Sequence, residues 1–126
     1  MIKNNFKILI LIFATIFMIS CKNEIKPTSK KLTSLKGKNI LHEVDIIAVG
    51  KKKYMIECKY HNEAGTITRL QPAMYTYARF LDLGKYNFDH PWLVTNTKCS
   101  LDARKYAKGV KLKITGWSYP EKESLQ

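Results

Sequence analysis

Two segments in the middle of the chain have the apolar composition of β-strands. Residues 40–49 (ILHEVDIIAV) and 54–60 (YMIECKY) are rich in β-branched and aromatic residues, and a turn of glycine and lysines lies between them. Two such segments around a short turn are typical of a β-hairpin. Residues 31–36 alternate weakly, which predicts a shorter strand that ends at Gly37.

The period becomes helical over residues 68–83. One face of this predicted helix carries five apolar residues, which are Leu70, Met74, Tyr77, Ala78 and Leu81. Thr68 and Gln71 fit a capping box, Pro72 lies in the first turn, and Gly84 ends the helix.

The remaining segments predict a strand, a helix and a strand. Residues 91–95 read as a buried strand, Ser100 or Asp102 caps a helix that Gly109 ends, and residues 111–117 form the last strand. The order of elements predicts an α/β domain with a mixed sheet flanked by helices. Four aromatic residues follow these periods and are expected in the core: Tyr75, Tyr77, Phe80 and Trp92.

The N-terminus reads as an export signal. Two lysines precede an apolar run at residues 8–19, which is too short to span a bilayer but suits a signal peptide. The sequence Met18-Ile19-Ser20-Cys21 is similar to a lipobox, with Cys21 as the lipid-anchored residue. We therefore expect a signal at 1–20, a Lys-rich tether at 21–36, a domain at 37–126 and a location in the cell envelope. The alternative is a buried or amphipathic helix of a cytoplasmic protein.

Length and charge set further limits. The 126 residues suit one domain and exclude a repeat array, and 45% hydrophobic with 11% aromatic residues excludes lengthy disorder. The net charge of +12 favours a polyanionic partner, either nucleic acid or an anionic membrane. Residues 41–96 carry only +1, however, with seven Lys and Arg against six Asp and Glu. The basic charge therefore lies mainly outside the segment with candidate chemistry.

Cys58 and Cys99 are the cysteines of the predicted domain. They are not part of a C-x-x-C motif or a Cys/His cluster, so a structural zinc site is not expected. A Cys58–Cys99 disulfide remains open, and two separate thiols are the preferred interpretation.

Acidic residues stand in the middle of both predicted hairpin strands. Pairing of the strands would bring Asp45 close to Glu57, and Lys59 shares a strand face with Glu57. Buried carboxylates are costly unless a cation or proton lies between them, and Mg²⁺ prefers such oxygen ligands. An exposed strand face with solvated carboxylates is the alternative interpretation.

In these residues the chain resembles the PD-(D/E)xK restriction-endonuclease-like superfamily, and its Mrr-like branch in particular. Asp45 matches the Asp of the motif, and Glu57-Cys58-Lys59 matches the (D/E)-x-K. The segments HEVDIIA, IECKYHN, YTYARFLDL, WLVTNTK and WSYP are also similar to bacterial proteins of this kind, so that the resemblance covers residues 37–125.

The resemblance implies Mg²⁺- or Mn²⁺-dependent hydrolysis of DNA phosphodiesters. Asp45 and Glu57 would hold the metal, Lys59 would position the attacking water, and Gln71 would support the site. His42 and Glu43 are expected to be structural neighbours, and His61 a surface residue at a strand end. Contact of DNA with the polar turn Thr95-Asn96-Thr97-Lys98 and formation of a homodimer are left open.

The superfamily fold normally begins with a helix. The predicted signal and tether take its place in this chain, so we expect the N-terminal core helix to be missing. Two further hypotheses therefore stay open beside the nuclease. One is a catalytically silent nucleic-acid-binding or structural lipoprotein that keeps the fold. The other is a small membrane-surface protein whose lysines contact anionic lipids.

Overall fold

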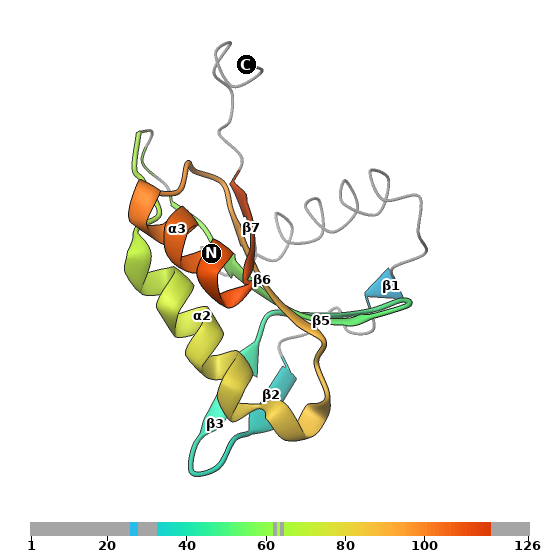
Figure 1. The fold of residues 1–126 in the computed structure, drawn as a ribbon. Coiled ribbons are helices and arrows are strands. Elements are labelled where there is room, and N and C mark those ends of the chain that lie inside the picture. The colour runs from blue at the N-terminus through green and yellow to red at the C-terminus, as the bar shows by residue number, and fades with distance from the viewer. Residues whose placement is uncertain (1–25, 28–32, 62, 64, 117–126) are drawn as a thin grey trace.

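The structure is a computed structural model that describes residues 26–27, 33–61, 63 and 65–116 (Figure 1). The elements, in chain order, are β1 (Lys26–Pro27), β2 (Thr33–Lys36), β3 (Leu41–Val44), β4 (Ile46–Val49), β5 (Lys53–Lys59), α2 (Leu70–Asp82), the 3₁₀ turn η1 (Gly84–Tyr86), β6 (His90–Thr95), α3 (Leu101–Val110) and β7 (Lys113–Gly116).

A mixed five-stranded sheet, in the order β1-β4-β5-β6-β7, forms the centre of the fold. β4 and β5 are antiparallel, as the predicted hairpin requires, whereas β5, β6 and β7 are parallel to one another. Parallel neighbours need crossover connections, and α2 and α3 supply them. Figure 1 shows the two helices side by side against the sheet. The predicted α/β class, a mixed sheet flanked by helices, is confirmed.

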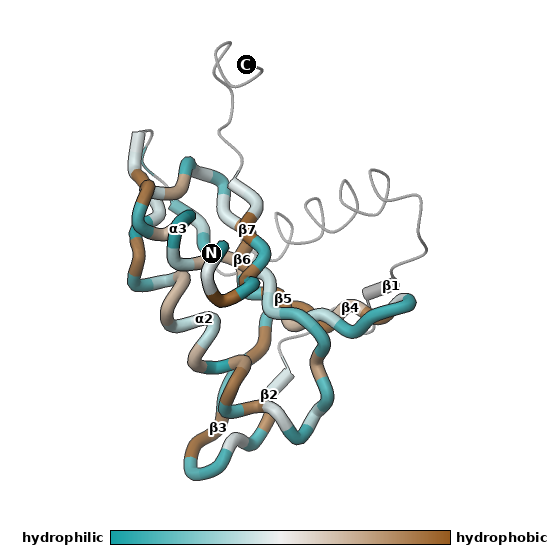
Figure 2. The backbone as a smooth tube through the Cα atoms, in the orientation of Figure 1, coloured by the Kyte–Doolittle hydropathy of each residue, from teal (hydrophilic) through white to brown (hydrophobic). Residues whose placement is uncertain are grey.

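The core lies around β6, whose side chains pack against apolar residues in two separate clusters. Leu93 packs against α2 and α3 with Ala73, Ala103 and Ala107, whose small side chains allow close packing of the helices. Trp92, only 1% exposed, packs with residues of β4 and β5. The prediction of Trp92 as a core residue is confirmed. Figure 2 shows the hydrophilic β4–β5 turn at the far end of the apolar strands.

The predicted apolar face of α2 is wrong. Ala73 and Thr76 are the buried residues of the helix, while Met74 and Leu81 are 46% and 58% exposed. Tyr75 is 62% exposed, so its placement in the core is also wrong. The buried face differs from the predicted one because the small side chains of Ala73 and Thr76 fit closely against the sheet. The Thr76 hydroxyl is satisfied by donating to the Pro72 carbonyl oxygen.

Two of the four predicted helix ends are correct. Gly84 directly follows Leu83, the C-cap of α2, so this helix ends where the sequence predicts. Ser100 caps α3 by accepting a hydrogen bond from the Ala103 N–H. The capping box at Thr68 is wrong, because Arg69 is the N-cap of α2 and makes no side-chain capping bond. Gly109 does not end α3 either, since the helix continues to Val110 and Lys111 adopts the left-handed conformation at φ 60°.

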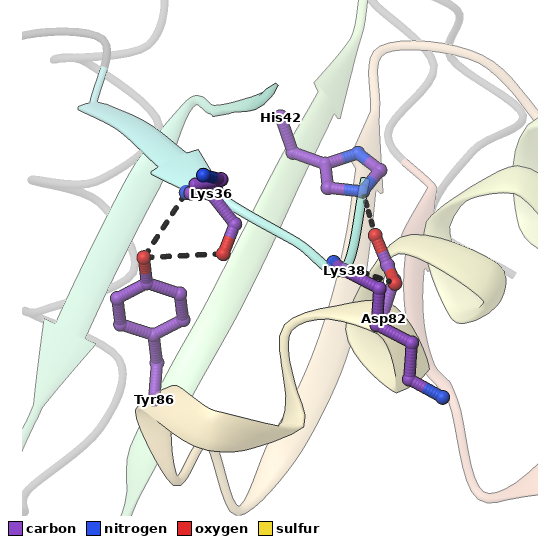
Figure 3. Close-up of polar contacts among 5 residues, drawn as sticks. All are labelled: Lys36, Lys38, His42, Asp82 and Tyr86. Atoms are coloured by element: carbon purple, nitrogen blue, oxygen red, sulfur yellow. Dashed lines mark hydrogen bonds and ion pairs between the residues drawn. The ribbon is translucent and has the colours of Figure 1, made fainter. Parts of the chain in front are cut away.

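β2 and β3 form a separate two-stranded sheet, which confirms the short strand predicted before Gly37. This hairpin is attached to the end of α2 and to η1 (Figure 3). The His42 ring donates from Nε2 to Asp82 Oδ2 at 2.6 Å, and the Lys38 N–H donates to Asp82 Oδ1 at 3.2 Å. The Lys36 N–H also donates to the Tyr86 hydroxyl at 3.0 Å. The structural role expected of His42 is thus explained by Asp82.

The predicted signal, the lipobox at Cys21, most of the tether and the missing core helix lie outside the described residues. In the part of the chain that the structure describes, no helix is long and apolar enough to cross a bilayer.

Candidate functional site

The site begins at a break between two strands. The sequence predicts one strand over residues 40–49, and this is wrong, because β3 and β4 belong to different sheets with Asp45 between them. Aspartate has low strand propensity, and its side chain competes for backbone hydrogen bonds. Here Asp45 Oδ2 accepts the Cys58 N–H at 2.8 Å. The break therefore directs the Asp45 carboxylate toward β5.

The β4–β5 register brings the two predicted metal ligands together. Ile46 pairs with Ile56, so Asp45 comes opposite Glu57 one position further along. Burial, together with the Asp45 charge, raises the pKa of Glu57 to about 7, against the opposing effects of Arg79 and Lys59. Burial is also the main cause of a raised pKa at Asp45. The Asp45 and Glu57 carboxylates are thus close together, as the sequence predicts.

Sequence reasoning missed Arg79, the residue of α2 that contacts this pair. Its Nη1 donates to Glu57 Oε2 in an ion pair, and its side chain is only 11% exposed. Its guanidinium carbon lies 4.8 Å from the centre of the Tyr75 ring. Gln71, Tyr75 and Arg79 are spaced four residues apart and so follow one stripe of the helix. The spacing puts Arg79 on the same stripe as Gln71, but it does not tell which way that stripe faces, so the sequence alone could not place Arg79 beside Glu57.

The two other predicted site residues lie at the edge of this pair. Lys59 is exposed at the end of β5, two residues from Glu57, and its charge lowers the pKa of Glu57. Gln71 is exposed in the first turn of α2 and makes no side-chain hydrogen bond within the described residues. Glu43 is exposed on β3 and acts on Asp45 through its charge.

A buried threonine cluster, made of Thr68, Thr95 and Thr97, occupies the region after β6. The Thr68 hydroxyl lies 2.8 Å from the hydroxyls of both other threonines. Because these side chains are at most 7% exposed, the hypothesis that Thr95 and Thr97 face DNA is wrong. Lys98 is exposed.

His61 is fixed against this threonine cluster. Its N–H donates to Asn96 Oδ1 at 2.9 Å, Asn96 Nδ2 donates to its carbonyl oxygen at 2.8 Å, and its Nε2 lies 3.0 Å from Thr68 Oγ1. Burial, with the nearby charge of Lys59, lowers the pKa of His61. Hydrogen bonds therefore hold His61 in place beside Lys59, at the end of β5.

The donor set at Asp45 and Glu57 fits a hard divalent cation. Asp45 Oδ1 and Glu57 Oε1 accept no hydrogen bond from the described residues, and two raised pKa values indicate a need for positive charge. Larger groups of three or more His, Cys, Asp or Glu suited to a metal are absent from the described ranges. A metal held here would use few protein ligands, as Mg²⁺ does.

The two cysteines of the predicted domain do not form a disulfide. Cys58 and Cys99 are free thiols of intermediate exposure, which confirms the preferred interpretation over the disulfide. Burial raises the pKa of both thiols.

The mixed sheet flanked by helices matches the fold of endonucleases of known structure. The fold of the chain matches that of a repair endonuclease from Pyrococcus abyssi, with a TM-score of 0.61 and 20% identity over 92% of this chain and 47% of the other. The structure of an EndoMS complex with double-stranded DNA also gives a TM-score of 0.61, at 15% identity over 94% of this chain and 46% of that one. At these identities the likeness shows the fold.

More similar proteins have no assigned function. A crystal structure of a protein of unknown function gives a TM-score of 0.72 at 44% identity, over 90% of this chain and 59% of that one. An uncharacterized protein of Archaeoglobus fulgidus is 52% identical over 93 residues, which are 73% of this chain and 53% of that protein. The chain thus spans little more than half the length of these relatives. No protein-family model matches the sequence.

Proposed function

We propose that the protein is a metal-dependent DNA endonuclease of the Mrr-like type. Asp45 and Glu57 would hold Mg²⁺ or Mn²⁺, Lys59 would position the attacking water, and Gln71 would support the site. The observation that carries the proposal is the position of Asp45 at a strand break, opposite Glu57, with Lys59 two residues along the same strand.

A half-buried carboxylate pair whose pKa values are raised despite the nearby Arg79 favours a bound cation, and such pairs are typical of functional sites. A bound divalent cation supplies charge that polarises a phosphodiester and lowers the pKa of water. The chain itself contributes the two carboxylates that anchor the cation and the Lys59 ammonium beside them. The endonuclease fold and the DNA-bound neighbour support DNA as the substrate.

Plasmid nicking by the full chain with Mg²⁺ or Mn²⁺ tests this proposal. We expect cleavage that a chelator abolishes, and a loss of at least about 100-fold in Asp45→Asn and in Lys59→Met. Glu43→Gln is the matched control, because it removes an exposed carboxylate only two residues from Asp45, and it should retain activity within about twofold. Equal nicking by wild type and Asp45→Asn would contradict the proposed site.

The second candidate is a catalytically silent nucleic-acid-binding protein, and the ion pair between Arg79 and Glu57 favours it. It predicts DNA binding that weakens steeply with salt and no cleavage with either metal. Filter binding at several salt concentrations, run beside the nicking assay, separates the two candidates.

We also propose that the chain is exported and anchored in the cell envelope through Cys21, on the basis of the apolar run and lipobox-like sequence before it. Mass spectrometry of the mature N-terminus tests this: a lipid-modified Cys21 is expected. An intact Met1 in a soluble fraction would reject it.

A further inference from the structure

The Arg79 side chain is a buried cation with incomplete pairing. Nη1 binds Glu57 Oε2, and the guanidinium lies over the Tyr75 ring, but Nε is buried without a hydrogen-bond partner in the described part of the chain. A buried, unpaired N–H destabilises the folded protein, because it loses its hydrogen bond to water. Attraction to the carboxylates therefore determines the position of the Arg79 side chain more than a full set of hydrogen bonds does.

The charge of Arg79 acts on both members of the acidic pair. It lowers the pKa of Glu57 and that of Asp45, opposing the effect of burial. Two buried carboxylates side by side need positive charge, and in the metal-free protein the guanidinium supplies it. Arg79 thus occupies the electrostatic role that a divalent cation would take.

We propose that Arg79 is an internal counter-cation that competes with the divalent metal for the Glu57 carboxylate. The inference rests on the metal site proposed above and concerns what the metal must displace. A guanidinium and a metal ion on the same carboxylate repel each other, so binding of one weakens the other. Tyr75, which is exposed and already in contact with the guanidinium, offers it a resting place when Glu57 is taken.

The opposite role would be orientation. If Arg79 only holds Glu57 in the geometry that the metal needs, removing it would weaken metal binding. Competition predicts the reverse sign: the metal-free protein becomes less stable, but the freed carboxylate binds metal more tightly. The sign of the change in metal affinity therefore decides between the two roles.

Calorimetric titration of the full chain with Mn²⁺ tests the sign. We expect Arg79→Met to bind Mn²⁺ at least about fivefold more tightly than wild type. Lys59→Met is the matched control, because Lys59 also lowers the pKa of Glu57 through its charge but forms no ion pair with it among the described residues. Its gain in affinity should be clearly smaller than that of Arg79→Met.

The outcomes separate this inference from the proposed function. If wild type binds Mn²⁺ but Arg79→Met binds equally or more weakly, Arg79 orients Glu57 and competition is refuted, while the metal site stands. Equal gains in Arg79→Met and Lys59→Met refute it as well, since charge alone then explains the effect. If neither wild type nor any variant binds Mn²⁺, the metal site itself fails, and the inference fails with it.

A measurement on the wild type covers the case in which Arg79→Met does not fold. The chain has three arginines, Arg69, Arg79 and Arg104, so their Nε–H signals can be assigned by NMR. Arg69 and Arg104 are exposed and serve as internal controls. Saturating Mg²⁺ should speed exchange of the Arg79 Nε–H with water by about tenfold or more, because the side chain leaves its buried position. Unchanged exchange would refute displacement.

Discussion

The raised pKa of Glu57 makes the stability of the metal-free protein depend on pH. The folded state binds the Glu57 proton more tightly than the unfolded chain, in which the ordinary pKa is 4.5, because of burial and the Asp45 charge. This contribution to the free energy of unfolding is complete below pH 4.5 and is lost as the pH rises through about 7. Stability from this group therefore falls with rising pH.

Glu57→Gln isolates this effect. With a pKa of 4.5 in the unfolded chain and about 7 in the folded state, at about 1.36 kcal/mol per unit, linkage gives a loss of about 2.5 kcal/mol between pH 5 and pH 8. Glutamine does not titrate, so the stability of the variant relative to wild type should improve by about 2.5 kcal/mol over the same range. The effect of the Arg79 ion pair is already contained in the pKa of Glu57.

Urea denaturation followed by circular dichroism, at pH 5 and pH 8 with a chelator present, measures this difference. Comparison of variant and wild type at the same pH cancels the contributions of the titratable groups that both proteins share. Glu43→Gln, which removes an exposed carboxylate, should show a much smaller change with pH. If the stability difference between Glu57→Gln and wild type stays constant within about 0.5 kcal/mol, Glu57 ionises as in water and the reasoning from burial and like charge is refuted.

Two further predictions concern the supports of the site. In Gly37→Ala the new Cβ would overlap Asp82 Oδ2 and force Asp82 away from His42, so the melting temperature should fall by several degrees. An unchanged value in differential scanning calorimetry would show that the contact between Asp82 and His42 is dispensable. Thr68→Val should cost about 1–3 kcal/mol in urea denaturation, because three hydrogen-bonding partners lose the buried hydroxyl; Thr68→Ser, which retains it, should cost clearly less, and equal losses would implicate packing instead.

Much of the fold follows from patterns that are local in the sequence. The hairpin around Gly50, the buried strand with Trp92 and the Ser100 cap are set by neighbouring residues, and the structure confirms each of them. The break at Asp45 could not be predicted in this way. It depends on a hydrogen bond to the Cys58 N–H, thirteen positions away, which only the paired strands bring within reach.

The residues of the site also divide into those that local sequence patterns predict and those that depend on tertiary contacts. Asp45, Glu57 and Lys59 could be named because a hairpin has a simple register, and the structure brings the two carboxylates together. Arg79 could not be placed, because its contact with Glu57 depends on the rotation of α2 about its axis. That rotation is set by the fit of Ala73 and Thr76 against the sheet, and the apolar pattern of the helix gave a different face.

The attachment of the β2–β3 hairpin to α2 has a mechanical consequence. The hairpin leads directly into Asp45 along the chain, and through Asp82 it also holds the helix that carries Arg79 three residues earlier. A force on the hairpin thus reaches one carboxylate through the backbone and the other through the helix. The hairpin tip at Ile40 and Leu41 is exposed, so the segment that leads into Asp45 and is bonded to α2 can be reached from solvent.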